Sequence, residues 1–372
     1  MSIVFDESRR IFRLDAGNSS YAFLIESNGY VAHLYYGERL NTTDLCYLYR
    51  PTQRAFSPNP ADGTAEDTRD AMPQEYSTFG LGDYRVPSAK VRRANGYNAT
   101  DMKYRSHRIY RGKPAIAGLP ATFGKAEEVE TLGWDLAFLA DGDVEFTLFY
   151  TVFEDLAAIA RSVKVTNRSG ETVYIEKAAS CTLDFAYGDF ELLHLPGAWA
   201  RERHVERRKL SHSIQRIESR RGLSSHQHNP FFALVTPDAT ETAGEAFGVA
   251  LLYSGNFSAE IELDQFDQIR TQIGINPETF EWELAPNGEF HTPEAVMVYS
   301  AEGLGGMSRT FHDLFRRHLI RSYWRDRKRP ILVNNWEATY FNFDSEKLIR
   351  IAEDAARLGI EMLVLDDGWF GH

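Results

Sequence analysis

The C-terminal segment of this chain constrains the fold more than any other part of the sequence. Two short apolar runs, Ile331–Val333 and Met362–Leu365, flank a stretch in which apolar residues recur at helical spacing. Neither run alternates polar with apolar residues, which is typical of strands buried on both faces of a sheet. Asp344 or Ser345 can cap the start of the helix, and Gly359 can end it. The pattern predicts a βαβ unit, in which a helix connects two parallel strands.

Carboxylates and tryptophans follow both predicted strands. Trp336 and Glu337 come shortly after the first strand, and Asp366, Asp367 and Trp369 come at the end of the second. In parallel α/β architectures, ligands bind at the carboxyl ends of the strands. Ionised carboxylates accept hydrogen bonds from hydroxyl groups, and an aromatic face can stack on the C–H face of a sugar ring. The placement therefore indicates a sugar-binding site.

Asp366 and Asp367 have other interpretations. Asp-Asp-Gly can simply be a turn that closes a strand, although its position at a buried parallel strand favours a binding role. A glycosidase's catalytic carboxylates flank the scissile bond from opposite sides, roughly 5 Å or more apart, whereas adjacent residues at one strand end approach from one side. We therefore expect the two aspartates to bind substrate hydroxyls.

A divalent metal is the rival ligand, but no local histidine cluster or further acidic motif completes a coordination shell. Four other histidines lie in polar stretches that lack metal-ligand spacing and are expected to be solvated: His204, His212, His226 and His228. We expect no metal and no cofactor.

The size and charge of the chain limit its class and its partners. A length of 372 residues suits two or three domains, and the formal net charge of −12 argues against nucleic acid or an anionic membrane surface as the main partner. No apolar run approaches the length of a membrane span, and Met1–Glu7 lacks the pattern of a signal peptide. Cys46 and Cys181 are expected to stay reduced. These features predict a cytoplasmic protein.

Most of the chain before the βαβ unit reads as antiparallel strands. Alternating apolar runs flank Asn-Gly or Asp-Gly pairs, the turn residues of tight hairpins, at Asn28-Gly29, Asp141-Gly142 and Asn287-Gly288. Other alternating runs flank Ser169-Gly170 and Gly255-Asn256. This many hairpins at short spacing predicts a large antiparallel sandwich over residues 1–302.

Two segments interrupt the strand pattern. Arg50–Arg85 is a long loop whose end carries Tyr76, Phe79 and Tyr84, and we expect it to serve in assembly because a monomer would leave these rings poorly covered. Leu304–Tyr323 has a helical apolar face, which predicts a helical linker over residues 303–329. The βαβ unit then occupies residues 330–372. Because two strands cannot make a stable parallel sheet, the chain is expected to be a fragment of a longer protein.

Trp199 is a further candidate for the site. It lies in Leu195–Arg203, a turn that enters a strongly charged strand. By its chemistry alone, a large aromatic residue at this position can equally fill a core.

Four motifs together resemble the bacterial α-galactosidases of glycoside hydrolase family 36, and the similarity runs along nearly the whole chain. The motifs are Asn335–Tyr340, Val364–Gly371, Leu195–Arg203 and Gly82–Pro87. The resemblance implies an N-terminal β-supersandwich followed by a (β/α)8 barrel, of which residues 330–372 are the incomplete start. It also implies a small C-terminal β-domain beyond this chain.

The resemblance further implies the roles of the site residues. Asp366 and Asp367 would hold hydroxyls of a terminal galactose, Trp336 would line the same pocket, and Trp199 would reach it from the sandwich. The family's retaining mechanism uses an aspartate nucleophile and an aspartate acid/base on later barrel strands, so no catalytic residue is expected in this chain. A homotetramer acting on melibiose or raffinose is implied. A raffinose-type galactosyltransferase, an α-N-acetylgalactosaminidase and a non-catalytic carbohydrate-binding or assembly module stay as alternatives.

Overall fold

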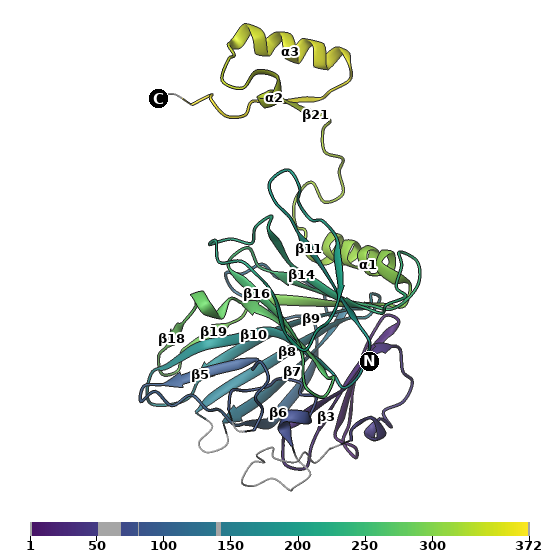
Figure 1. The fold of residues 1–372 in the computed structure, drawn as a ribbon, viewed down its shortest axis with the longest axis vertical. Coiled ribbons are helices and arrows are strands. Elements are labelled where there is room, and N and C mark those ends of the chain that lie inside the picture. Colours follow the sequence, from purple (N-terminus) through teal and green to yellow (C-terminus); the bar gives the residue numbers. More distant parts are fainter. Residues whose placement is uncertain (1, 51–67, 81, 139–142, 371–372) are drawn as a thin grey trace. The chain divides into compact units, whose positions relative to one another are not determined.

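The computed structural model describes residues 2–50, 68–80, 82–138 and 143–370. The chain divides into two compact units, Met1–Leu319 and Ile320–His372 (Figure 1). Antiparallel strands dominate the first unit, whereas the second contains one parallel pair of strands and two helices. No helix among the residues that the structure describes is long and apolar enough to cross a membrane.

The described strands of the first unit form three sheets. The 4-stranded sheet has the order β1 (Ile3–Asp6), β2 (Ile11–Ala16), β3 (Ser19–Ile25), β4 (Val31–Glu38). The 10-stranded sheet has the order β12 (Glu206–Lys209), β11 (Glu191–Pro196), β14 (His228–Val235), β15 (Ala246–Leu252), β20 (Glu294–Ser300), β9 (Ala158–Asn167), β8 (Val144–Phe153), β7 (Val129–Phe138), β6 (Met102–Arg111), with β19 (Glu289–His291) also paired to β9. The 6-stranded sheet has the order β13 (Ser213–Glu218), β16 (Phe257–Leu263), β17 (Ile269–Ile275), β10 (Val173–Phe185), β18 (Trp282–Leu284), with β5 (Ala89–Arg93) also paired to β10.

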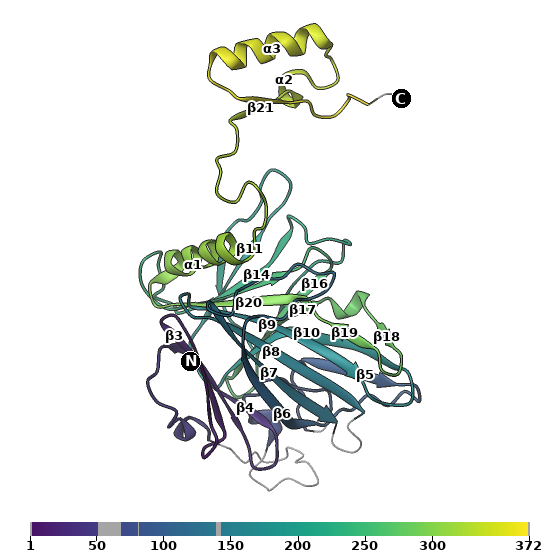
Figure 2. The ribbon, with the colours of Figure 1, turned by 180° about the vertical axis from the view of Figure 1, so that it is seen from behind.

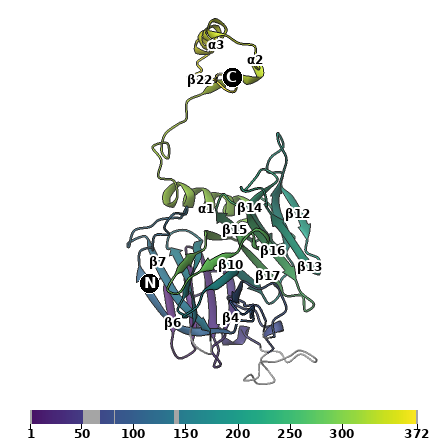
Figure 3. The ribbon, with the colours of Figure 1, turned by 90° about the vertical axis from the view of Figure 1, so that its left-hand side faces the viewer.

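The first unit has two main apolar cores. The larger core joins residues of all three sheets, including Phe23, Trp134 and Phe257, none of which is exposed. Figures 2 and 3 show the strands of the first unit from two further sides. The second core lies between the 10-stranded sheet and helix α1 (Gly303–His318), which buries Met307 and Phe311 against strands β9, β15 and β20. The antiparallel sandwich expected from the alternating runs is therefore present, and α1 packs as part of the first unit. Single-turn 3₁₀ segments lie at Cys46–Leu48, Arg69–Ala71 and Pro277–Thr279.

Some predicted hairpins are wrong because the short turns connect different sheets. Strands β3 and β4 do pair across Asn28-Gly29, and β7 pairs with β8, although the turn at 139–142 lies outside the described residues. The strands around Asn287-Gly288 do not pair with each other, because β18 joins β10 in one sheet and β19 joins β9 in another. Asn287 has the positive φ that such a turn favours. A turn signal thus predicts a reversal of the chain, but not the partner of the next strand.

The predicted assembly loop is partly packed into the sandwich. Residues 51–67 of this loop lie outside the described residues. Tyr76, expected to be uncovered, is instead buried, and its hydroxyl donates a hydrogen bond of 3.1 Å to the carbonyl of Ala179. Only Phe79 and Tyr84 of the three rings are exposed. Tyr76 is buried because its segment folds against the sheet. Ser77 and Ser88 exchange hydrogen bonds, and the neighbouring Tyr76 contacts Ala179 on β10.

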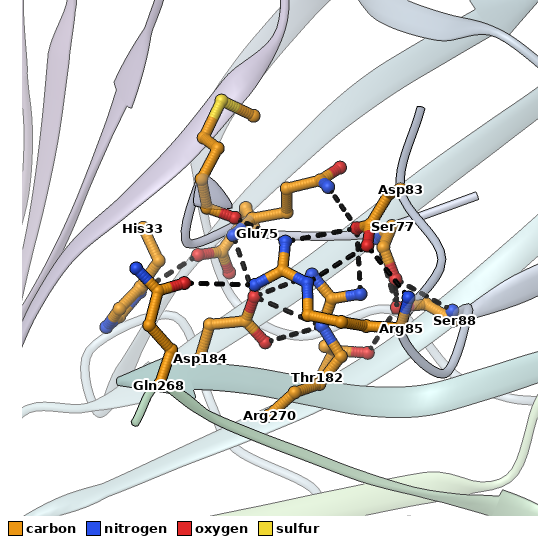
Figure 4. Close-up of polar contacts among 12 residues, drawn as sticks. His33, Glu75, Ser77, Asp83, Arg85, Ser88, Thr182, Asp184, Gln268 and Arg270 are labelled. Carbon is orange, nitrogen blue, oxygen red and sulfur yellow. Dashed lines mark hydrogen bonds and ion pairs between the residues drawn. The ribbon is translucent and has the colours of Figure 1, made fainter. Parts of the chain in front are cut away.

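A buried ionic network fixes the same segment (Figure 4). The guanidinium of Arg270 on β17 lies 2.8 Å from Asp184 on β10 and 2.9 Å from Asp83, and all three side chains are almost fully buried. Arg85 binds Asp83 at 2.9 Å and donates to the carbonyl of Met72. Burial alone raises the pKa of the Asp83 carboxyl, but the charges of Arg270 and Arg85 outweigh it and hold that pKa below its usual value.

The second unit is the predicted βαβ arrangement. Strands β21 (Leu332–Asn334) and β22 (Met362–Val364) pair in parallel, and helices α2 (Trp336–Thr339) and α3 (Ser345–Arg357) connect them. Asp344 caps α3 by accepting a hydrogen bond of 2.8 Å from the amide of Lys347, and Gly359 follows the helix with positive φ. This confirms the predicted caps.

The expected burial of the two parallel strands on both faces is wrong for the described chain. Leu332 is 51% exposed and Met362 is 38% exposed, and Leu358 at the end of α3 is 82% exposed. Among the described residues each strand has one partner, and α3 packs on β22, yet apolar side chains of the unit still face solvent. The described residues contain no closed barrel.

Candidate functional site

The parallel register of the second unit places four polar and aromatic side chains at adjacent strand ends. Asn334 pairs with Val364, so the residues that follow each strand emerge at the same edge. We call Asn334, Trp336, Asp366 and Asp367 the strand-end cluster. It contains three of the four predicted substrate-binding residues.

The carboxylate of Asp366 is oriented by two donors from this edge. The side-chain amide of Asn334 donates a hydrogen bond of 2.6 Å to Asp366 Oδ2, and the backbone amide of Asp367 donates one of 2.8 Å to Oδ1. Both oxygens therefore have a protein partner, and each keeps a further lone pair that can accept a hydrogen bond from a ligand.

Asp367 is held differently. Its Oδ1 accepts a hydrogen bond of 2.8 Å from the amide of Gly368, and no described residue donates to its Oδ2. Gly368 has φ +86°, and a Cβ there would lie 2.9 Å from the ring of Phe341. The glycine thus allows the turn to approach an aromatic ring closely. Asp367 Oδ2 is the carboxylate oxygen of the cluster that accepts no hydrogen bond from a described residue.

Trp336 is a half-buried ring fixed by its neighbours. Its backbone amide donates a hydrogen bond of 2.8 Å to Asn334 Oδ1, and its ring meets Tyr340 and Phe341 edge-on, with centroids 5.4 and 5.0 Å away. The Tyr340 hydroxyl donates to Glu337, and that hydrogen bond raises the pKa of the hydroxyl. The Phe341 ring packs against Trp336 and occupies the space that a Cβ at Gly368 would enter, so it lies close to both strand ends.

The two asparagines at the first strand end had no predicted role. Asn335 is fully buried, donates to the Thr339 hydroxyl at 2.9 Å, and accepts a hydrogen bond of 2.8 Å from the backbone amide of Asp366. Its neighbour Asn334 makes the two contacts described above. Two consecutive asparagines at the end of a predicted strand are the signal that could have found them, since an amide that becomes buried there requires hydrogen-bonding partners.

Trp199 belongs to the first unit. It lies at the tip of a tight hairpin in which Ala198 and Arg201 exchange backbone hydrogen bonds, and 85% of its surface is exposed. Gly197 permits this turn, because a Cβ there would lie 2.6 Å from the carbonyl oxygen of Arg201. The exposed ring excludes the core-filling interpretation. Its approach to the strand-end cluster stays a prediction.

The four histidines do not assemble a site. His212 contacts Asp267 at 2.9 Å, and His228, expected to be solvated, is half-buried and stacked on His194 with ring centroids 6.0 Å apart. Among the residues that the structure describes, no group of three or more His, Cys, Asp or Glu side chains is arranged to hold a metal ion.

Comparison with known proteins identifies the family. The model of the glycosyl hydrolase family 36 N-terminal domain matches residues 29–285, and the model named Melibiase matches residues 289–372. The chain belongs to glycosyl hydrolase family 36. Both matches agree with the four motifs, and the second covers the whole strand-end cluster.

Several relatives from this family are similar over the full length of the chain. It is 48% identical to α-galactosidase AgaA of Geobacillus stearothermophilus and 46% identical to α-galactosidase Mel36A of Lactobacillus acidophilus, and each match covers 100% of the chain and 51% of the relative. The crystal structure of AgaB from G. stearothermophilus superposes with a TM-score of 0.95 at 47% identity, covering 100% of this chain and 51% of that one. A crystal structure of an AgaA variant in complex with raffinose has a TM-score of 0.94 at 48% identity, covering 97% and 50%. The chain thus spans about half the length of the family 36 relatives that it matches.

Proposed function

We propose that the complete protein containing this chain is an α-galactosidase that hydrolyses terminal α-D-galactose from oligosaccharides such as melibiose and raffinose. The observation that carries the proposal is the convergence of Asp366, Asp367 and the half-buried Trp336 at one edge of the parallel strand pair. Oriented carboxylates suit the hydroxyls of a sugar, and the ring suits its C–H face. The family relatives named α-galactosidases support the same reaction.

The catalytic residues of the proposed enzyme would lie outside this chain. By family resemblance, the reaction proceeds with retention through two aspartates on later strands of a (β/α)8 barrel, of which residues 330–372 form the start. The sandwich would occupy residues 1–302, residues 303–329 would connect the two, and Trp199 would reach the galactose pocket. The exposed apolar side chains of the second unit support this assignment, since further barrel elements would cover them.

Kinetics with matched substrates test the proposed reaction. We expect the complete protein to release p-nitrophenol from p-nitrophenyl α-galactoside and free galactose from melibiose and raffinose. Preference for p-nitrophenyl N-acetyl-α-galactosaminide would instead identify an α-N-acetylgalactosaminidase. Product analysis at high raffinose concentration distinguishes hydrolysis from transfer: longer oligosaccharides as the main products would indicate a galactosyltransferase and contradict the proposal.

Residues 1–372 expressed alone should have no α-galactosidase activity. Hydroxyl-binding groups without an opposing nucleophile cannot lower the barrier to glycosidic cleavage. We also expect proteases to cut residues 330–372, where Ile331 and Leu332 are exposed, before the sandwich. The measurement is turnover of p-nitrophenyl α-galactoside by the purified chain beside the complete protein. Turnover by the chain alone, free of host enzyme, would mean that the catalytic residues have been misplaced.

We further propose a homotetramer with the segment that carries Phe79 and Tyr84 at the contact between subunits. Both rings are exposed on a segment that the buried ionic network holds in place, which gives a rigid apolar surface. Tyr84→Ser combined with Phe79→Ser should move the mass measured by light scattering from tetramer toward monomer. Tyr47→Ser, which removes an equally exposed tyrosine elsewhere, should leave the mass unchanged. A monomeric wild type, or an unchanged mass in the double variant, refutes the proposal.

A further inference from the structure

We propose that Asn334 is a positioning residue that sets the Asp366 carboxylate and the start of the Trp336 helix for sugar binding. This inference rests on the proposed function and adds a residue that does not itself need to touch the sugar. Asn334 joins the carboxylate at the second strand end to the backbone after the first: its Nδ2 donates to Asp366 Oδ2 at 2.6 Å, and its Oδ1 accepts from the Trp336 amide at 2.8 Å.

The orientation of the amide makes these two contacts depend on each other. A side-chain amide has one accepting end, its oxygen, and one donating end, its NH2 group, and here the accepting end is fixed by the backbone of Trp336. The donating end must then point at Asp366, which is the only way to keep both hydrogen bonds. An aspartate at this position would keep the contact to Trp336 but would place a second carboxylate against Asp366. An alanine would lose both contacts.

Asn335 supports the same geometry from within the unit. It is fully buried and binds the backbone amide of Asp366 rather than its carboxylate. The two neighbouring asparagines therefore act on different parts of Asp366, because Asn335 fixes the main chain at the second strand end and Asn334 fixes the rotation of the carboxylate. Asn334 is exposed, so its replacement removes the only side-chain donor to the Asp366 carboxylate among the described residues without opening a cavity in the unit.

The first experiment compares N334A with wild type in the complete protein. We expect kcat/KM on p-nitrophenyl α-galactoside to fall about tenfold, because a misdirected acceptor loses most of a charge-assisted hydrogen bond to the sugar. The affinity for D-galactose, measured by calorimetry, should weaken in parallel. N342D is the matched control: Asn342 lies in the loop after α2, is exposed, and its side-chain amide makes no hydrogen bond with a described residue.

The pH dependence of kcat/KM in N334D tests the positioning role, because a merely structural role of Asn334 would not change it. Two carboxylates at hydrogen-bonding distance cannot both stay ionised easily, so the pKa of one of them rises. At pH 7 the kcat/KM of N334D on p-nitrophenyl α-galactoside should be lower than that of N334A. As the pH falls toward 5, one of the two carboxyls takes up a proton, and its O–H can then donate a hydrogen bond to the neighbouring carboxylate as the asparagine amide does. The deficit in kcat/KM relative to wild type should therefore shrink about tenfold. N334A and N342D should keep a constant ratio to wild type over the same range.

The outcomes separate this inference from the proposed function. A wild-type protein without turnover of any α-galactoside contradicts the proposed function. If the wild type is active, an N334A variant within twofold of wild-type kcat/KM, or an N334D deficit that does not change between pH 7 and pH 5, overturns the positioning role alone. Circular dichroism at both pH values confirms that each variant is folded, and N334D keeps the test decisive if N334A does not fold.

Discussion

Asp367→Ala in the complete protein is expected to lower kcat/KM on p-nitrophenyl α-galactoside by roughly tenfold or more, and Asp366→Ala is expected to do the same. A hydrogen bond to a charged group contributes about 1.5–3 kcal/mol, and each ~1.4 kcal/mol is a factor of ten in rate. The loss should be larger for Asp367, because its Oδ2 has no donor among the described residues and is free to accept a sugar hydroxyl. Asp366 already accepts hydrogen bonds at both oxygens.

Asp354→Ala is the control for this pair. Asp354 lies on the same unit, is exposed, and makes an ion pair with Arg357 one turn along α3. Exposed pairs of this kind contribute little to stability, so the variant should keep wild-type kinetics. Near-wild-type kcat/KM for both Asp366→Ala and Asp367→Ala would remove the substrate-binding assignment from the strand ends.

Arg270→Met is expected to destabilise the sandwich by about 3–5 kcal/mol, because its removal leaves the buried carboxylate of Asp184 without its cation and that of Asp83 with Arg85 alone. The side chains of Asp83 and Asp184 are each at most 3% exposed, and both carboxylates pair with this guanidinium. Burial alone lowers the pKa of Arg270, but the two carboxylates outweigh it and raise the pKa. The measurement is urea denaturation of the 372-residue chain, followed by tryptophan fluorescence at pH 7.

The pH dependence of Arg270→Met checks the cause. In the wild type the lowered pKa of Asp83 contributes stability above the unfolded pKa of about 4, and that stability is lost as the pH falls through the folded value. In the variant the same carboxyl is buried without this cation, so its pKa rises and it takes up a proton more readily. The gap between the two proteins should therefore narrow below about pH 5.

Arg316→Met provides the comparison for an exposed arginine. Arg316 is 58% exposed and pairs with Asp313 at 3.3 Å on the surface of α1. Its replacement should change the urea midpoint little. If Arg270→Met has an equally small effect, the network in Figure 4 does not stabilise the segment that it contacts.

Local patterns in the sequence predicted the elements well where hydrogen bonding is also local. Asp344 and Gly359 correctly predicted the ends of α3, and Asn28-Gly29 correctly predicted a hairpin, because a few neighbouring residues decide caps and tight turns. The strand-end position of the candidate site residues in the second unit was predicted for a similar reason. Trp336 and the two aspartates follow short apolar strands whose parallel pairing is set by the helix between them.

The partners of strands and charges were not predictable in this way. The turn at Asn287-Gly288 is read correctly as a turn, yet the strands on either side join different sheets, because sandwich packing rather than the turn selects their neighbours. Tyr76 appeared uncovered because its partner Ala179 lies 103 residues along the chain. No local signal encodes a contact of that separation.

The sequence by itself determined the family, the antiparallel class of the first 300 or so residues and the strand-end position of Trp336, Asp366 and Asp367. Periodicity, caps and short motifs act through neighbouring residues and can be read along the chain. Only the tertiary structure decided that Arg270 joins Asp83 and Asp184 in the core, and that Asn334 orients the Asp366 carboxylate. Those contacts depend on the distance and direction of side chains brought together by folding, and a linear pattern contains neither.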